Sequence, residues 1–348
     1  MANSAHLALL KTGVKSWNSW RAANPCIAPD LENADLEGIN LQGFNLILAN
    51  CTNANLNNAD LSNANLASSN LTGASLVRAI LSNAKLSQTR LIEADLSHAT
   101  CDRAMLNEAV LIEATLYNTT FRHARLMNAN LCGAILIGTN FKQANISGCS
   151  VRGMFAFGVK LKGTTQSNLV IHQLKKQRII VDRFELSQLM HLLIWEDSTS
   201  LELEFPSNIA LILGDFRGRR RHFFFHIQEK LRDRKLIPLL FEYNAAFNLQ
   251  DTALPTLLKI AQVIVFDISH VESLHRWLEE IQPAPPVQIL AQTQSGGRKP
   301  GKGRIRSSRH LPICRYRNFD EMCLNLQDSP ILTEDETEEA SETCHQAK

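Results

Sequence analysis

The stretch "ANCTNANLNNADLSNANL", residues 49–66, is rich in Asn, yet every fifth residue in it is apolar. Its composition alone is typical of a disordered chain, because it contains few large apolar side chains. The apolar residues keep the same spacing well beyond this stretch, from Leu31 to Val151. A disordered chain has no reason to keep such a phase, so the pattern predicts a repeat structure with a core.

Each repeat of five residues has two positions that we expect to face the interior. The centre is usually Leu, and two residues before it lies a small residue, usually Ala, as at Ala54 and Ala94. Residues two apart on an extended segment point the same way. The other three residues, typically Asn, Ser, Asp, Glu or Arg, then face outward or turn the corner, which Asn and Asp tolerate because they adopt left-handed backbone angles. The pattern predicts a solenoid whose coils hydrogen-bond to one another.

These repeats, as in "NANLNNADLSNANLASSNL", resemble the pentapeptide-repeat family, whose motif is A(D/N)LXX. The resemblance implies a right-handed quadrilateral β-helix with four pentapeptides in each coil. The 25 centres from Leu31 to Val151 then form roughly six coils, stacked about 4.8 Å apart. After Val151 the apolar register decays, so we expect the β-helix to occupy residues 29–160.

An open end of a solenoid exposes unpaired backbone groups and needs a cover. In "HLALLKTGVKSWNSW", Leu7, Leu10, Val14 and Trp17 fall on one face of a helix. We therefore expect residues 1–28 to form a helical cap. Trp17 and its neighbour Trp20 are interpreted as packing residues, with a binding surface as the alternative.

The second half of the chain follows a different pattern. Short, almost wholly apolar runs, typical of strands buried on both faces, occupy residues 208–214, 236–243, 263–269 and 287–292. Helical stretches alternate with them at residues 221–235, 251–262 and 271–282. This alternation predicts a parallel sheet with crossover helices. We place it in residues 207–327, after a connector with one helix at 161–206.

A ligand of such a sheet lies beyond the carboxyl ends of its strands. We predict that the ligand-binding residues are Asp215, Arg217, Asp267 and Ser269. "GDFRGR" has the backbone donors and the Arg to hold a phosphate, although it lacks the glycine spacing of a phosphate loop, and an ordinary turn is the alternative. For Asp267, capping of the next helix is the alternative to contact with a ribose or base.

The segments "IALILGDFRG", "LRDRKLIPLLFEY" and "IAQVIVFDIS" resemble the Toll/interleukin-receptor-like domain that recurs behind pentapeptide repeats in bacteria. The resemblance implies a flavodoxin-like parallel-sheet domain and a nucleotide-like small ligand. The chain departs from this group in two places. Asn248 and Thr252 stand where the group carries Arg and an acidic residue, and residues 293–310 lack the aromatic residues of the relatives.

Catalytic signals are weak. "SHVESLHRWLEE" slightly resembles the catalytic segment of enzymes of this group, but Glu280 lies one residue nearer Trp277 than in their pattern. Glu280 is therefore a weak catalytic candidate, and a solvated helix face is the alternative. His222 and His226 have helical spacing without a third ligand, so we expect no metal site. No cofactor is expected.

Charge and composition limit which partners and which cellular location we expect for the protein. The formal net charge of +2 is too small to indicate a nucleic-acid or membrane partner. The N-terminus lacks the features of a secretory signal and no apolar run has the length of a membrane span, so we expect a cytoplasmic protein. The eight cysteines have no metal-ligand spacing and are interpreted as reduced thiols. A basic loop at 293–310 and an acidic, disordered tail at 328–348 complete the predicted organisation.

Three hypotheses of function follow. The first is a non-catalytic interaction or scaffold protein, in which the rod presents an α/β binding module to an unidentified protein partner, with a homodimer through the solenoid end as a further hypothesis. The second is a nucleotide-processing enzyme of the NAD glycohydrolase or nucleoside transferase type. The third is a DNA-mimicking protein that binds gyrase. It requires a strongly negative rod, but residues 31–151 contain nine acidic and seven basic residues.

Overall fold

The computed structural model divides into two compact units, residues 1–172 with 181–192 and residues 173–180 with 193–348. The residues that it describes are 2–174, 177–187, 208–214, 220–242, 253–267, 287–292 and 313–316. Several predicted features lie outside them, namely Asp215, Arg217, Ser269, Glu280, the helix at 271–282, the basic loop 293–310 and the acidic tail 328–348.

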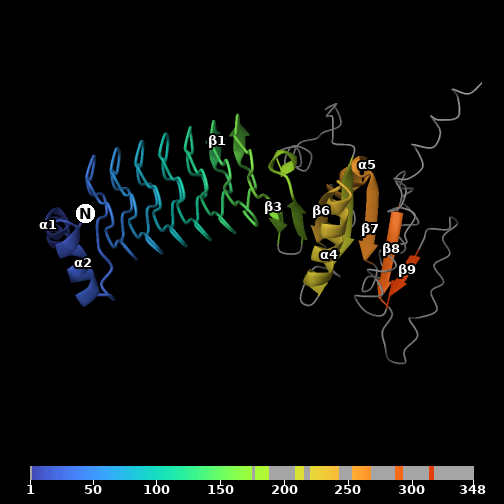
Figure 1. Cartoon of the computed structure of the whole chain (residues 1–348), viewed down its shortest axis with the longest axis horizontal. Helices are drawn as coiled ribbons and strands as arrows, with labels where there is room; N and C mark the ends of the chain where they lie inside the picture. Colours follow the sequence, from blue (N-terminus) through green and yellow to red (C-terminus); the bar gives the residue numbers. More distant parts are fainter. Residues whose placement is uncertain are drawn as a thin grey trace, which may run out of the picture. The chain divides into compact units, whose positions relative to one another are not determined.

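The first unit contains a rod of stacked coils, drawn in blue to green in Figure 1. Parallel bridges join residues 20 apart, beginning with Asp30 and Asn50. The bonds between coils include one from the Leu31 amide to the Asn50 carbonyl, at 2.7 Å. Each coil therefore consists of four pentapeptides, as the resemblance implied.

The coils continue beyond the end expected at residue 160. Bridges still join Asn145 to Thr165 and Ser150 to Val170, so the rod spans seven steps of 20 residues from Asp30. In the last coil the centres are Ala156, Leu161 and Gln166, and they are only partly buried. The bonds between coils are made by the backbone, so the coil persists where the apolar register has already decayed.

The interior of the rod is formed by the two predicted positions of each repeat. Leu centres such as Leu96 and small residues such as Ala94 are at most a few per cent exposed. Phe121 and Phe141 stack with their ring centroids 5.2 Å apart. Burying one Leu contributes about 2 kcal/mol, and the ordering of each residue costs about 1–2 kcal/mol, so stability depends on the stacking of many coils.

Two helices, α1 (Ser4–Lys11) and α2 (Val14–Ala23), pack against the first coils. The sequence predicted a single helix here, but Gly13 between them has a φ of 99°, which interrupts it. Trp17 is completely buried, and its indole N–H donates to the Asn45 carbonyl at 2.8 Å. The interpretation of Trp17 as a packing residue is therefore confirmed.

Two short strands at the far end of the rod, β1 (Ile135–Ile137) and β2 (Phe155–Phe157), pair in parallel. The boundary between the two units falls in β3 (Leu169–Leu174) and β4 (Gln177–Val181). Helical residues 184–187 follow.

The second unit contains strands at each of the four apolar runs. They are β5 (Ile209–Gly214), β6 (Ile237–Glu242), β7 (Val263–Asp267) and β8 (Val287–Gln292). A further strand that the sequence did not predict is β9 (Ile313–Tyr316). The order β4-β6-β5-β7-β8-β9 is parallel from β6 to β9.

Two helices accompany these strands, α4 (Arg220–Asp233) and α5 (Ala253–Ile260). Phe224, Ile227 and Leu231 lie one turn apart on α4 and pack against alternate residues of the sheet, including Ala210 and Ile212. Every residue of β5 is buried, as expected for a central strand of a parallel sheet.

Candidate functional site

The outward residues of the rod have fixed local roles. An Asn or Asp just before the centre accepts a hydrogen bond from the amide two residues later, as Asn65 does from Ala67 at 3.2 Å. The second residue after the centre turns the corner with positive φ, as Asn53 does at 54°. Arg78 and Glu93 do the same, at 60° and 56°, so the corner is not restricted to Asn, Asp and Gly. The strain, about 1–2 kcal/mol each, is offset by backbone bonds between coils.

The small net charge of the rod conceals a segregation of its charges. Residues 31–70 contain four carboxylates and no Lys or Arg. Residues 131–170 contain no carboxylate and four cations, Lys142, Arg152, Lys160 and Lys162, all of them exposed. The two ends of the rod therefore suit partners of opposite charge.

Between these ends lies an ion pair that joins successive coils. The Arg122 Nη2 lies 2.5 Å from the Asp102 Oδ2, and the Arg122 Nε donates to the same oxygen at 2.7 Å. Partial burial by itself raises the pKa of Asp102, but the hydrogen bonds and charge of Arg122 outweigh it and hold this pKa below its ordinary value.

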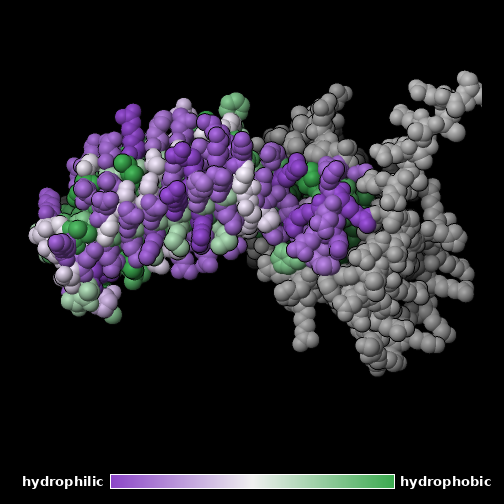
Figure 2. Space-filling model, in the orientation of Figure 1, coloured by the Kyte–Doolittle hydropathy of each residue, from purple (hydrophilic) through white to green (hydrophobic). Residues whose placement is uncertain are grey.

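Exposed apolar side chains gather near the far end of the rod. Tyr117, Ile135, Phe155 and Phe157 are 41%, 40%, 59% and 71% exposed, and we name them, together with Ile137, the apolar stripe. Ile135 pairs with Phe155 and Ile137 with Phe157. In most repeats these outward positions carry polar residues, and the side of the rod visible in Figure 2 is largely hydrophilic.

The apolar stripe was not predicted from the sequence. The signal was present, because its members stand directly before or after a centre, where the side chain faces outward. In a continuous sequence, apolar residues at these positions cannot be distinguished from the apolar centres beside them. They become visible when the sequence is written in rows of 20 residues, one row for each coil. Only then do Tyr117, Ile137 and Phe157 fall in one column.

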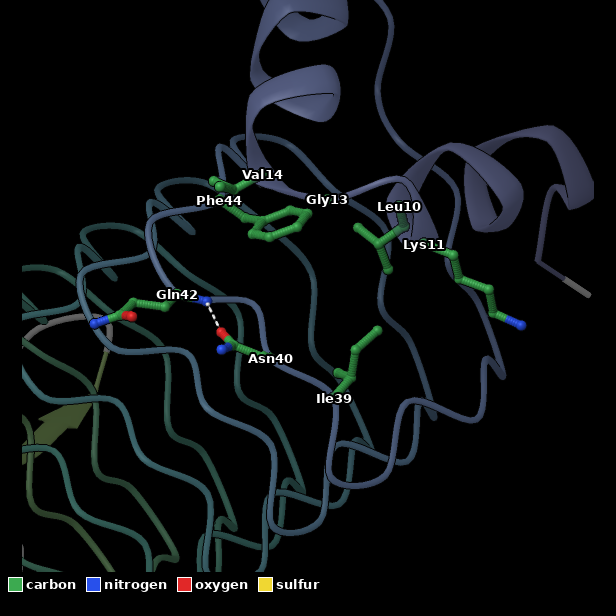
Figure 3. A pocket seen from close by; sticks show the side chains of 8 residues that line it. All are labelled: Leu10, Lys11, Gly13, Val14, Ile39, Asn40, Gln42 and Phe44. Atoms are coloured by element: carbon green, nitrogen blue, oxygen red, sulfur yellow. Dashed lines mark hydrogen bonds between the residues drawn. The ribbon is translucent and has the colours of Figure 1, made fainter.

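A shallow cavity of about 470 Å³ lies between the cap helices and the first coils. Figure 3 shows Leu10, Ile39 and Phe44 directed toward it, whereas the Lys11 side chain extends away. The Asn40 Oδ1 accepts a hydrogen bond from the Gln42 amide at 3.0 Å, so it is engaged in its own turn. The lining is partly apolar and partly polar, and its one ionisable side chain, Lys11, points away from the cavity.

The register of the second unit brings three strand ends to one level. Gly214 of β5 is paired with Glu242 of β6. Leu213 is paired with Phe266 of β7, so Asp267 stands level with Gly214. Two acidic residues therefore flank the end of the central strand, where a parallel sheet of this kind binds its ligand. Of the predicted ligand residues, the structure describes only Asp267, and that only through its backbone.

Other kinds of site find little support among the described residues. No group of three His, Cys, Asp or Glu side chains is placed to hold a metal ion in that part of the chain. Within the same ranges, no helix has the length and apolar character needed to cross a membrane. Burial raises the pKa of the Cys51 and Cys149 thiols to about 12, which keeps them protonated at neutral pH.

Comparison with known families identifies the repeats. The family model described as pentapeptide repeats matches eight copies, over residues 30–66, 49–88, 89–126 and 124–163. The resemblance predicted from the five-residue motif is therefore confirmed for these residues, which all lie in the first unit. No curated protein matches the chain.

Several solved structures are similar to the chain. HetL, a pentapeptide repeat protein involved in heterocyst differentiation regulation from the cyanobacterium Nostoc sp. strain PCC 7120, is 24% identical, with a TM-score of 0.23, over 41% of this chain and 83% of HetL. A pentapeptide repeat protein from the Arabidopsis thaliana thylakoid lumen is 32% identical, with a TM-score of 0.23, over 29% of this chain and 66% of that protein. Another pentapeptide repeat protein, from Nostoc PCC 7120, is 28% identical, with a TM-score of 0.26, over 29% of this chain and 79% of that protein.

Proposed function

We propose that this chain is a non-catalytic, cytoplasmic interaction protein, in which a pentapeptide rod provides a rigid surface and a Toll/interleukin-receptor-like module binds a nucleotide-like ligand. The observation that carries the proposal is the construction of the rod. Its centres and small residues are buried, while its outward side chains stand in columns one coil apart. Such a surface has its backbone already ordered before a partner binds, which favours recognition.

The module is supported by the order of its strands. The order β6-β5-β7-β8-β9 corresponds to 2-1-3-4-5, the flavodoxin-like arrangement, whose ligand lies where β5 and β7 end. Asp267 stands at this place. Catalysis at a glycosidic bond also needs a carboxylate at the reacting carbon, and Glu280 is displaced by one residue from the pattern of the catalytic relatives. A displacement of about 1 Å can already cost about a hundredfold in rate.

The DNA-mimicking alternative is weakened by the distribution of charge. A rod that imitates DNA needs negative charge along its length. Residues 131–170 contain four cations and no carboxylate. We expect no protection of gyrase in a supercoiling assay, and clear protection would restore this alternative.

The full chain should bind NAD or a nucleoside without converting it. Binding is measured by calorimetry, and products are followed by chromatography after long incubation. Asp267→Asn should weaken binding at least tenfold. Asp233→Asn is the matched control, because it makes the same change at the exposed end of α4, which precedes β6 and therefore lies toward the opposite ends of the strands.

Two results would contradict the proposal. Turnover that disappears in Glu280→Ala would show that the chain is an enzyme. If wild type, Asp267→Asn and Asp233→Asn bind equally well, the ligand does not bind at the strand ends.

A further inference from the structure

We propose that the apolar stripe is the docking surface for an acidic amphipathic helix of a partner protein. The inference rests on the proposed interaction role and specifies where on the rod a partner binds and what chemistry it has. Phe155 and Phe157, on either side of a centre, are 59% and 71% exposed, whereas the aromatic centres Phe121 and Phe141 are fully buried. Aromatic side chains held rigidly at a surface are the usual anchors of protein interfaces.

The stripe is continuous along three coils. The Asn118 amide donates to the Ile137 carbonyl at 2.7 Å, and the Gly138 amide donates to the Phe157 carbonyl at 2.8 Å. These bonds hold the coils of Tyr117, Ile137 and Phe157 in direct succession. The Tyr117 ring is further fixed by an edge contact with His98, with centroids 5.2 Å apart.

The spacing of the stripe suits a helix better than a strand. Successive coils are about 4.8 Å apart, and one turn of an α-helix rises about 5.4 Å. Side chains at positions i, i+4 and i+7 of a helix lying along the rod therefore meet Tyr117, Ile137 and Phe157 in turn. A strand places same-face side chains about 6.8 Å apart and loses this match within two coils.

The charge of the partner follows from the margins of the stripe. Arg152 precedes β2 by three residues and Lys160 follows it by three, so exposed cations border the last strand on both sides. Residues 131–170 contain no carboxylate to neutralise them, and Glu113 lies at the corner that precedes the Tyr117 coil, so the cationic rim belongs to the last coil. An apolar centre with a charged rim is the usual anatomy of a protein interface, and this rim selects carboxylates on both margins of the helix.

Two other occupants fit less well. A second copy that met this one through its own last coil would bring Arg152 and Lys160 against cations of the same kind, which opposes self-association in that arrangement. A single nucleic-acid strand needs cations along the path of its phosphates. The outward positions of the stripe's own face, residues 115, 117, 135, 137, 155 and 157, contain no Lys or Arg.

The test uses the full chain and two fluorescent helical peptides of about 16 residues, about 24 Å long. Both carry Leu and Phe on one face, and one has Glu and the other Lys at its remaining positions. Fluorescence anisotropy should show saturable binding of the Glu peptide, at least tenfold tighter than that of the Lys peptide. Phe155→Ser/Phe157→Ser should weaken it at least tenfold, and Arg152→Glu/Lys160→Glu about tenfold, because each removes one half of the interface.

Ile80→Ser is the matched control, since Ile80 is 43% exposed in another column and its loss should leave binding unchanged. All variants change exposed side chains, so their melting temperatures should equal that of wild type. The proposal is overturned if no saturable binding is seen, if the two peptides bind equally well, or if Ile80→Ser weakens binding as much as Phe155→Ser/Phe157→Ser does. It is also overturned if an oligothymidine binds through the same residues, or if sedimentation shows a dimer that Phe155→Ser/Phe157→Ser abolishes. None of these outcomes depends on NAD binding or turnover, so the proposed function is tested separately.

Discussion

The middle of the rod and its last coil have the same backbone but different side chains. In the middle, Leu111 is fully buried as a centre. In the last coil Leu161 is only partly buried, and Phe155 and Phe157 face outward. The comparison shows that the coil is maintained by bonds between backbones, while the side chains decide how stable a coil is and what it offers to a partner.

The largest expected effect is in the middle of the rod. Leu96→Asp should unfold it, because a buried unpaired carboxylate costs several kcal/mol. Asn65→Asp should be nearly silent, since the carboxylate still accepts the hydrogen bond from the Ala67 amide. Thermal unfolding followed by circular dichroism measures both, and equal melting temperatures would contradict the assignment of interior and exterior positions.

The second prediction compares the two parts of the rod directly. Leu111→Ala should reduce the free energy of unfolding by about 2–5 kcal/mol, because it leaves a cavity in a close-packed interior. Leu161→Ala should cost about 1 kcal/mol, since this side chain is already partly in water. Urea denaturation measures the two losses. A loss at Leu161 as large as that at Leu111 would show that the last coil is packed like the middle.

A smaller effect is expected from the inward hydroxyls. Thr119 occupies the place of the small residue, and its Oγ1 donates to the Leu96 carbonyl of the preceding coil at 2.8 Å. Thr119→Val keeps the shape and removes this bond, which should cost about 1 kcal/mol. Thr119→Ser is the matched control, because it keeps the hydroxyl donor and removes only the methyl group. If Thr119→Val is as stable as wild type in urea denaturation, the hydroxyl contributes nothing.

The smallest effect concerns the partly buried Asp102 and its exposed partner Arg122. Asp102→Asn should lower the melting temperature by only about 1 °C, since ion pairs at the surface contribute little. The folded-state pKa of Asp102 lies below its ordinary value. The pair therefore stabilises the fold above the ordinary pKa, near 4, and this contribution is lost as the pH falls through the folded-state pKa. Melting curves from pH 7 to pH 2 should converge, and a difference that persists at pH 2 would contradict the role of ionisation.

The strand ends of the second unit were foreseen in part. The apolar runs predicted β5 to β8 to within two residues, because strands buried on both faces leave a continuous apolar signal. No long apolar run marks β9, whose four residues "ICRY" include the charged Arg315. That Asp267 lies level with Gly214 could not be predicted, because it depends on the pairing of β5 with β7, and these two strands are far apart in the chain.

The sequence by itself determined the coil of the rod and its interior. One local rule, a usually small residue two positions before a usually large one in every five, repeats from Leu31 to Val151, and each coil contacts only its neighbours. Only the tertiary structure decided where the coils end, which outward residues share a column, and which strand ends meet. The apolar stripe is an example, because Tyr117, Ile137 and Phe157 are 20 residues apart and become neighbours only when the chain has closed a full coil. These features depend on backbone hydrogen bonds between coils and between strands, and the two residues that form each bond are far apart in the sequence.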